Sequence, residues 1–172
     1  MPERVIRNRR VEQDDWKVLG LGGDVPAVLP RDPVIVPLAT WLASRDALRA
    51  RPEPIGVWLA PDDDPRALGG DLASIALIAV HFPKFADGRG YSTAYLLRSR
   101  LGFRGELRAI GDVGRDQLFY LSRVGYDAFS LPPHRDPEAA LASFADFAEV
   151  YQGSVVQPLP LFRRRGPAGV LA

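Results

Sequence analysis

Short apolar runs alternate along the chain with segments that have the periodicity of helices. We interpret the apolar runs as buried strands, and they cover Val34–Pro37, Ile55–Ala60, Ile75–Val80, Glu106–Ile110 and Tyr126–Leu131. The segments that suit helices are Leu38–Ala50, Tyr91–Leu101, Asp112–Arg123 and a last one that runs from Asp136 to Tyr151. The pattern therefore predicts strands and helices in regular alternation.

Alternation of this kind is typical of an α/β protein, because parallel strands need long crossover connections. We expect about five mostly parallel strands, which suits either half of a (β/α) barrel or a flavodoxin-like open sheet. The pattern alone does not fix the strand order. Residues 1–172 are expected to form a single α/β domain, with an N-terminal arm over 1–32 that has room for a short hairpin, a core over 33–152 and an extended, proline-bearing tail over 153–172.

Single residues indicate where the expected helices begin, end and face inward. Asp112 is suited to cap the third helix, and Gly125 follows that helix as a C-terminal glycine. Asp136 is suited to cap the last helix. The inner side of the second helix is expected to hold Ala94, Tyr95 and Leu97 or Arg98.

Composition removes several classes of function. The 172 residues include 22 Lys+Arg, 21 Asp+Glu and no cysteine, with a net charge of +1. The missing cysteine excludes thiol catalysis, cysteine-ligated zinc and a self-held iron–sulfur cluster. The balanced charge argues against nucleic-acid binding as the main task. No apolar run approaches the ~18 residues of a membrane span, and the N-terminus lacks the apolar middle of a secretory signal, so we expect a cytoplasmic protein.

Candidate chemistry gathers in the loops that follow the central strands. In parallel α/β sheets, ligands bind beyond the carboxyl ends of the strands. Three such loops are rich in polar residues, namely His81–Ser92, Gly111–Asp116 and Pro132–Asp136. They carry both histidines of the chain, Lys84, which is one of its two lysines, and Asp87, Asp112 and Asp116. We therefore expect these side chains to share one edge of the sheet.

The loop before the second helix has the features of an anion-binding site. Its glycines allow backbone N–H groups to approach an anion, and the helix dipole favours negative charge at that end. The candidate anion-binding residues are Lys84, Asp87, Gly88, Arg89, Gly90, Ser92 and Arg115. The segment is neither a Walker loop nor a dinucleotide fingerprint. The alternative interpretation is an ordinary glycine-bearing helix start, in which Arg89 and Asp87 pair with each other.

His81 and Asp112 are the candidate catalytic residues. His81 ends a predicted strand, where an imidazole suits general acid or base catalysis near neutral pH. The alternatives are a histidine hydrogen-bonded to a neighbouring loop and an aspartate that only caps a helix. His134 is interpreted as a surface loop residue. The spacing of His81, Asp87 and Asp112 matches no metal motif, so no metal site is expected.

Basic residues cluster near both ends of the chain, at Arg7–Arg10 and Arg163–Arg165. Such runs are usually solvated. A more specific interpretation is that they dock an acidic protein partner, with support from the apolar segment Pro158–Phe162.

Three segments together resemble a known bacterial family. They are His81–Ser92 (HFPKFADGRGYS), Gly105–Asp112 (GELRAIGD) and Arg115–Leu118 (RDQL). The chain resembles the proteins grouped as domain of unknown function 934, over about residues 30–165, including Tyr151-Gln152 and Pro160–Arg165. These proteins are often labelled as probable oxidoreductases of sulfite reduction. The resemblance assigns no catalytic residues.

The resemblance implies a protein of sulfur assimilation that acts with a sulfite or nitrite reductase subunit. We expect it to bind a small anionic ligand at the carboxyl edge of the sheet. Two alternatives stay open, a non-catalytic accessory or adaptor of a reductase complex and a small (β/α)-type enzyme that acts on a phosphorylated metabolite. The cofactor is unknown, with flavin binding left open, and a homodimer is the base-rate expectation.

Overall fold

The computed structural model describes residues 4–164 of the chain. Its strands are β1 (Arg4–Arg7), β2 (Arg10–Gln13), β3 (Lys17–Val18), β4 (Val34–Pro37), β5 (Ile55–Leu59), β6 (Leu77–Phe82), β7 (Glu106–Gly111) and β8 (Ala128–Phe129). Its α-helices are α1 (Leu38–Ala43), α2 (Arg45–Arg49), α3 (Arg89–Tyr95), α4 (Leu118–Val124), α5 (Pro137–Ala140) and α6 (Leu161–Arg164). Shorter turns of helix are η1 (Pro65–Leu68), η2 (Leu72–Ser74), η3 (Leu96–Arg100), η4 (Arg115–Gln117) and η5 (Leu141–Ala145).

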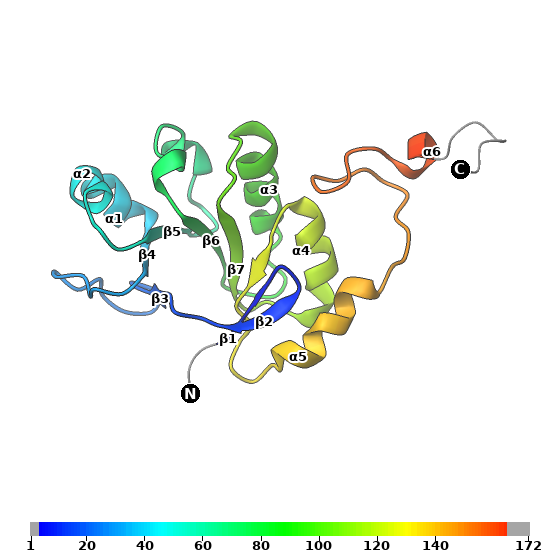
Figure 1. Cartoon of the computed structure of the whole chain (residues 1–172), viewed down its shortest axis with the longest axis horizontal. Helices are drawn as coiled ribbons and strands as arrows, with labels where there is room; N and C mark the ends of the chain where they lie inside the picture. Colours follow the sequence, from blue (N-terminus) through cyan, green and yellow to red (C-terminus); the bar gives the residue numbers. More distant parts are fainter. Residues whose placement is uncertain (1–3, 165–172) are drawn as a thin grey trace.

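All eight strands form one sheet, in the order β2-β1-β8-β7-β6-β5-β4-β3. From β3 to β8 each strand pairs in parallel with its successor in the chain. This sequential order, with the helices on the outer side of a curved sheet, is that of half a (β/α) barrel (Figure 1). The half-barrel prediction is confirmed. The flavodoxin-like alternative is wrong, because its strand order reverses direction within the sheet.

The sheet has eight strands rather than about five because residues before Val34 supply three of them. β1 and β2 form an antiparallel hairpin, and β1 also pairs antiparallel with β8. The hairpin turn places Asn8 and Arg9 at φ 49° and 63°, the left-handed conformation that a tight two-residue hairpin turn requires. β3 pairs with β4 at the opposite end of the sheet.

The sheet is strongly curled. β2 and β3 are at opposite ends of the strand order, yet only Asp14, Asp15 and Trp16 separate them in the chain. Four Cα steps span at most about 14 Å, so the two ends of the sheet must approach each other. The blue chain between β2 and β3 runs along the open side of the curve (Figure 1).

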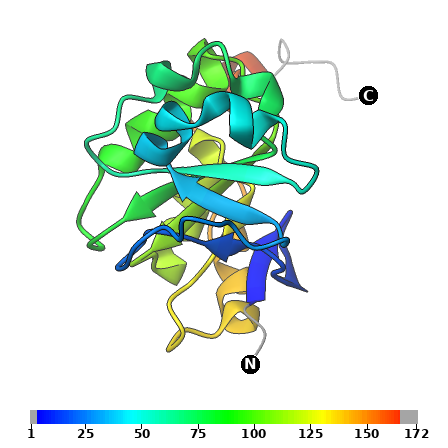
Figure 2. The same cartoon turned by 90° about the vertical axis from the view of Figure 1, so that its left-hand side faces the viewer.

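The two faces of the sheet pack differently. The outer face carries the main core, in which strand residues such as Val57 and Ile78 pack against Trp41 of α1 and Leu121 of α4. In the turned view, α1 and α2 lie on one side of β4 and β5 (Figure 2). The inner face has a smaller cluster, formed by Ile35, Leu77, Ala79 and Ile110 with Trp16, Val18 and Trp58 at its border.

An ion pair network fixes the N-terminal chain across the inner face. The Arg108 side chain is fully buried, and its Nη1 lies 2.7 Å from a carboxylate oxygen of Asp14, which is 3% exposed. Arg108 Nη2 lies 2.7 Å from Glu106. Glu106 also pairs with Arg7 of β1 at 2.7 Å, and Arg7 pairs with Glu12 at 2.6 Å. The network therefore joins β7, the hairpin and the connection to β3.

Three details of the helices differ from the predictions. The segment Leu38–Ala50 forms two helices that meet at Ser44. Tyr95 is 47% exposed rather than inward, because it lies about 100° around the helix from Ala94, which faces the core. The helical segment predicted from Asp136 to Tyr151 ends at Ala145, and Phe147 beyond it packs on the ring of Phe119 at 4.9 Å between centroids.

Two predicted helix ends are confirmed. Gly125 ends α4 with φ 114°, a backbone conformation that favours glycine. The Asp136 carboxylate accepts a hydrogen bond from Glu138 N at 3.1 Å and so caps α5. Among the helices of residues 4–164, none combines the length and the hydrophobicity that a membrane span requires.

Candidate functional site

The loops that follow β6, β7 and β8 meet at the carboxyl edge of the sheet. The Asp112 carboxylate, after β7, accepts a hydrogen bond from Phe85 N at 3.0 Å and lies 3.4 Å from Arg135 Nη2. Gln117 Nε2 donates to Phe85 O at 3.0 Å. Residues from three separate loops thus contact one another at this edge.

Asp112 does not cap the following helix, so that interpretation is wrong. The helical segment starts only at Arg115, with η4, and the backbone N–H of Gly114 donates to Gln117 Oε1 at 2.8 Å. Asp112 instead ties the loop after β6 to the loop after β8. Its role as a catalytic residue stays a prediction.

Arg89 and Asp87 pair closely, as the alternative interpretation of this loop expected. The Asp87 carboxylate accepts from the backbone N, Nε and Nη2 of Arg89 at 3.1, 3.0 and 2.6 Å. Arg89 Nη1 also lies 2.5 Å from Asp62. Hydrogen bonds from Arg89 lower the Asp87 pKa to about 2, and the same pairing raises the Arg89 pKa. Two carboxylates therefore already neutralise this guanidinium.

The other candidate anion-binding residues differ in their exposure to solvent. Lys84, Gly88, Ser92 and Arg115 are exposed, whereas Gly90 is buried. Within the described residues, Lys84 makes no ion pair. These contacts do not test whether the residues bind an anion. The anion-binding role of these residues, and of Asp87 and Arg89, stays a prediction.

Gly90 serves close packing. A Cβ atom at this position would collide with the ring of Phe82, whose side chain is almost fully buried. The Gly90 carbonyl also accepts a hydrogen bond from Tyr126 Oη at 2.8 Å. The glycine lets the start of α3 approach the end of β6.

We expect Gly90→Ala to lower the free energy of unfolding by about 1–3 kcal/mol, because the added methyl overpacks the core. The matched control is Gly88→Ala, since a Cβ there meets nothing within 4 Å and the residue already has helical backbone angles. Urea denaturation measures both variants. Equal stability of the two variants would contradict this account of Gly90.

His81 is half-buried on the inner face of β6. Its ring lies 6.0 Å from that of Trp58, edge to face at 75°. A Cβ on Gly111 would lie only 2.7 Å from the His81 ring, so the left-handed Gly111 (φ 95°) gives the imidazole its space. Burial lowers the His81 pKa, and the charge of Asp87 opposes that shift to a smaller extent.

The lowered His81 pKa predicts a pH-dependent stability. The unfolded chain takes up the proton first, near pH 6.5, so this contribution is present above that pH and is lost as the pH falls through the folded-state pKa. The free energy of unfolding should therefore fall more steeply between pH 7.5 and 5.5 in the wild type than in His81→Gln. An NMR titration of the His81 ring should give a midpoint below 6.5; a midpoint at or above 6.5 would refute this.

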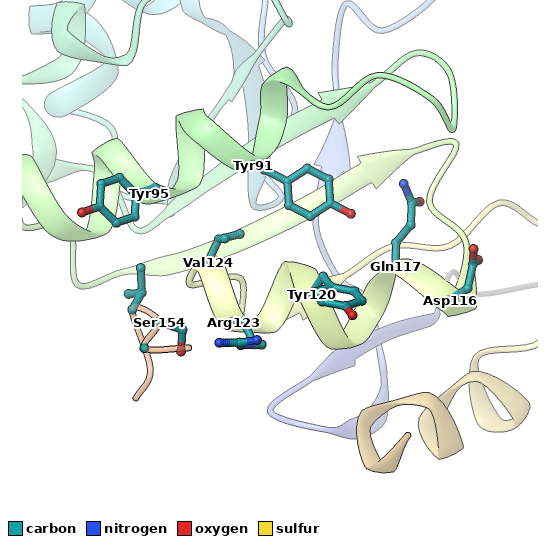
Figure 3. A pocket seen from close by; sticks show the side chains of 10 residues that line it. Tyr91, Tyr95, Asp116, Gln117, Tyr120, Arg123, Val124 and Ser154 are labelled. Carbon is teal, nitrogen blue, oxygen red and sulfur yellow. The ribbon is translucent and has the colours of Figure 1, made fainter. Parts of the chain in front are cut away.

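A groove between α3, α4 and the C-terminal segment is the feature that the sequence did not reveal. Its volume is about 530 Å³. Tyr91 and Tyr95, one turn apart on α3, face Tyr120 and Val124 of α4 (Figure 3). The other lining residues are Asp116, Gln117, Arg123, Gly153, Ser154 and Val155. Burial also raises the Tyr91 pKa. The i, i+4 spacing of Tyr91 and Tyr95 was the only available signal.

The C-terminal segment that closes the groove is held by α4. Val155 N donates to Arg123 O at 3.1 Å, and Arg123 Nη2 donates to Gln152 O at 2.6 Å. The exposed large apolar side chains of this segment are Phe147, Tyr151, Val156, Leu159 and Phe162. Phe147 also packs beside Tyr120, with 6.0 Å between ring centroids. We call these five side chains, together with Tyr95 and Tyr120, the aromatic surface. Five of the seven are aromatic, and Val156 and Leu159 are aliphatic.

Among residues 4–164, no three histidine, aspartate or glutamate side chains are grouped as ligands of a metal ion. Neither the curated proteins nor the solved structures include a significant match to this chain. A family model described as "Bacterial protein of unknown function (DUF934)" matches residues 56–162, which include α3, α4 and the whole aromatic surface. Because that match covers more than half of the 172 residues, the chain belongs to the bacterial DUF934 family.

Proposed function

We propose that this protein is a non-catalytic accessory that docks on a reductase of sulfite assimilation. The link to sulfite reduction rests on the family resemblance. The docking role rests on one observation, the run of exposed apolar side chains that starts at the groove and continues along the C-terminal segment.

The aromatic surface is unusual for a chain that acts alone. Tyr120 and Phe147 are each 50% exposed, and Tyr151 is 61% exposed. Extended apolar patches on soluble proteins mark interaction sites, and tyrosine is enriched among the residues that dominate binding energy. The neighbouring groove adds a concave, largely apolar contact for a side chain of the partner.

The charges beside the aromatic surface indicate the chemistry of the partner. Arg163 lies over the Phe162 ring at 6.0 Å and forms no ion pair with any residue in the described part of the chain. Arg164 is already paired with Glu149 at 3.1 Å. An apolar partner surface with acidic residues at its rim would complement both features.

Several charged groups at the carboxyl edge of the sheet are already paired within the fold, in contrast to the aromatic surface. Arg89 is neutralised by Asp87 and Asp62, and Asp112 is engaged by the Phe85 amide and Arg135. One predicted anion-binding cation, Arg89, and one of the two candidate catalytic groups, Asp112, are thus already occupied by contacts within the fold. The aromatic surface has no comparable cover within residues 4–164.

Tyr120→Asp tests the docking surface. Because the side chain is half exposed, the melting temperature should stay close to that of the wild type. Affinity for the purified assimilatory sulfite reductase, measured by calorimetry, should fall at least about 30-fold, as expected for a central interface tyrosine.

The control for Tyr120→Asp is Val28→Asp, which adds the same charge at an 85% exposed apolar residue of the N-terminal region. It should bind like the wild type. Undiminished binding by Tyr120→Asp, or equal losses in the two variants, would argue against docking through the aromatic surface.

A further inference from the structure

A second cavity lies at the carboxyl edge of the sheet, away from the aromatic surface. Its volume is about 360 Å³, and it lies between the start of η4, after β7, and the loop that follows β8. This is the region where parallel α/β sheets bind their ligands. Its size is at the lower end of the range for small-molecule sites, which suits one small ligand rather than a dinucleotide.

Two arginines and a histidine are among the residues that line this cavity. Arg115, His134 and Arg135 all line it. The Arg115 side chain is exposed and forms no ion pair or hydrogen bond with another residue in the range 4–164. Arg135 forms one ion pair, to Asp112 at 3.4 Å, which is longer than a strong charge-assisted contact, and its buried Nε has no hydrogen-bond partner. The positive charge here is less fully neutralised than that of Arg89.

The single carboxylate in the cavity wall is already engaged. Asp136 accepts the hydrogen bond from Glu138 N that caps α5, and it also lies 3.5 Å from Arg4. It therefore offsets the two arginines only in part. The rest of the wall is apolar and comes from Leu131, Ala139 and Ala140.

We propose that this cavity binds a small organic anion. Arg115 and Arg135, with His134, hold its phosphate, sulfate-like or carboxylate head, and Leu131 and Ala139 contact a short apolar body. Arginine suits this role because its planar group donates two parallel hydrogen bonds to such a head. The site differs from the predicted loop around Gly88-Arg89-Gly90 and shares only Arg115 with that residue set.

Calorimetric titration of the full chain with two probes, inorganic phosphate and propyl phosphate, tests the proposal. Propyl phosphate should bind about tenfold more tightly, because its methylene groups reach the apolar wall. Equal affinities would contradict the apolar contact, and the absence of binding by both probes at millimolar concentration would overturn the site.

Variants locate the site. Arg115→Gln should weaken propyl phosphate binding at least about tenfold without changing the melting temperature, since Arg115 is exposed and unpaired among the described residues. Arg104→Gln, at another exposed arginine, removes the same charge and should bind like the wild type. If Arg115→Gln binds propyl phosphate as tightly as the wild type, or if only Arg89→Gln loses affinity for it, the assignment of this cavity is overturned. Arg115→Gln should still bind the reductase, which separates this proposal from the docking function.

Discussion

Replacement of Arg108 by alanine is expected to lower the free energy of unfolding by about 3–5 kcal/mol. The guanidinium is fully buried and pairs with Asp14 and Glu106, each at 2.7 Å. Its removal leaves the buried Asp14 carboxylate without a counter-charge. Because Asp14 belongs to the three-residue connection between β2 and β3, this loss should also loosen the N-terminal chain from the inner face.

Urea denaturation measures the effect of Arg108→Ala, with Arg104→Ala as a control at an exposed arginine of the same region. The control should change stability by less than about 0.5 kcal/mol. The double variant Arg108→Met with Asp14→Leu should recover most of the loss, because apolar residues can replace a whole buried ion pair at little cost. A loss below about 1 kcal/mol in Arg108→Ala would show that the pair is not held as described.

Trp41→Ala should have a comparable effect, a loss of about 3–5 kcal/mol in the free energy of unfolding. Trp41 is fully buried in the outer core, and its Nε1 donates to Asp71 Oδ2 at 2.9 Å. The same carboxylate pairs with Arg45 at 3.2 Å and with Arg49. The substitution therefore removes a large apolar side chain and one hydrogen bond to a buried acid.

Two further variants separate these two contributions. Trp41→Phe keeps most of the apolar volume and loses the hydrogen bond to Asp71. It should therefore lower the free energy of unfolding by about 1–3 kcal/mol. Leu42→Ala, at the next residue, changes a side chain that is 38% exposed and should cost much less than Trp41→Ala. Thermal and urea unfolding measure these variants. Equal losses of stability in Leu42→Ala and Trp41→Ala would contradict the role of Trp41 as a buried residue of α1.

The central strands were predictable because they are buried on both faces. Burial on both sides gives a continuous apolar run, and β6 and β7 therefore lie close to their predicted ranges. β2 is mostly exposed and β3 has only two residues, so neither leaves such a run. The hairpin turn uses Asn8-Arg9 rather than a glycine pair, which removes the usual signal for a hairpin.

The candidate site was predictable only where it depends on topology. Parallel strands end at one edge, which is why the loops that hold Phe85, Asp112 and Arg135 meet. Which carboxylate pairs with which cation depends on distances across loops, and the pairing of Arg89 with Asp62 crosses 27 residues. The groove joins Tyr91 to Ser154 through the fold, and no local pattern relates residues so far apart.

The docking proposal is the central claim about function, and complex formation tests it most directly. Sedimentation velocity of the full chain mixed with purified assimilatory sulfite reductase should show one faster species that contains both proteins. The same mixture with Tyr120→Asp should sediment as two separate species. Separate sedimentation of the wild-type chain and the reductase at micromolar concentrations would contradict the account.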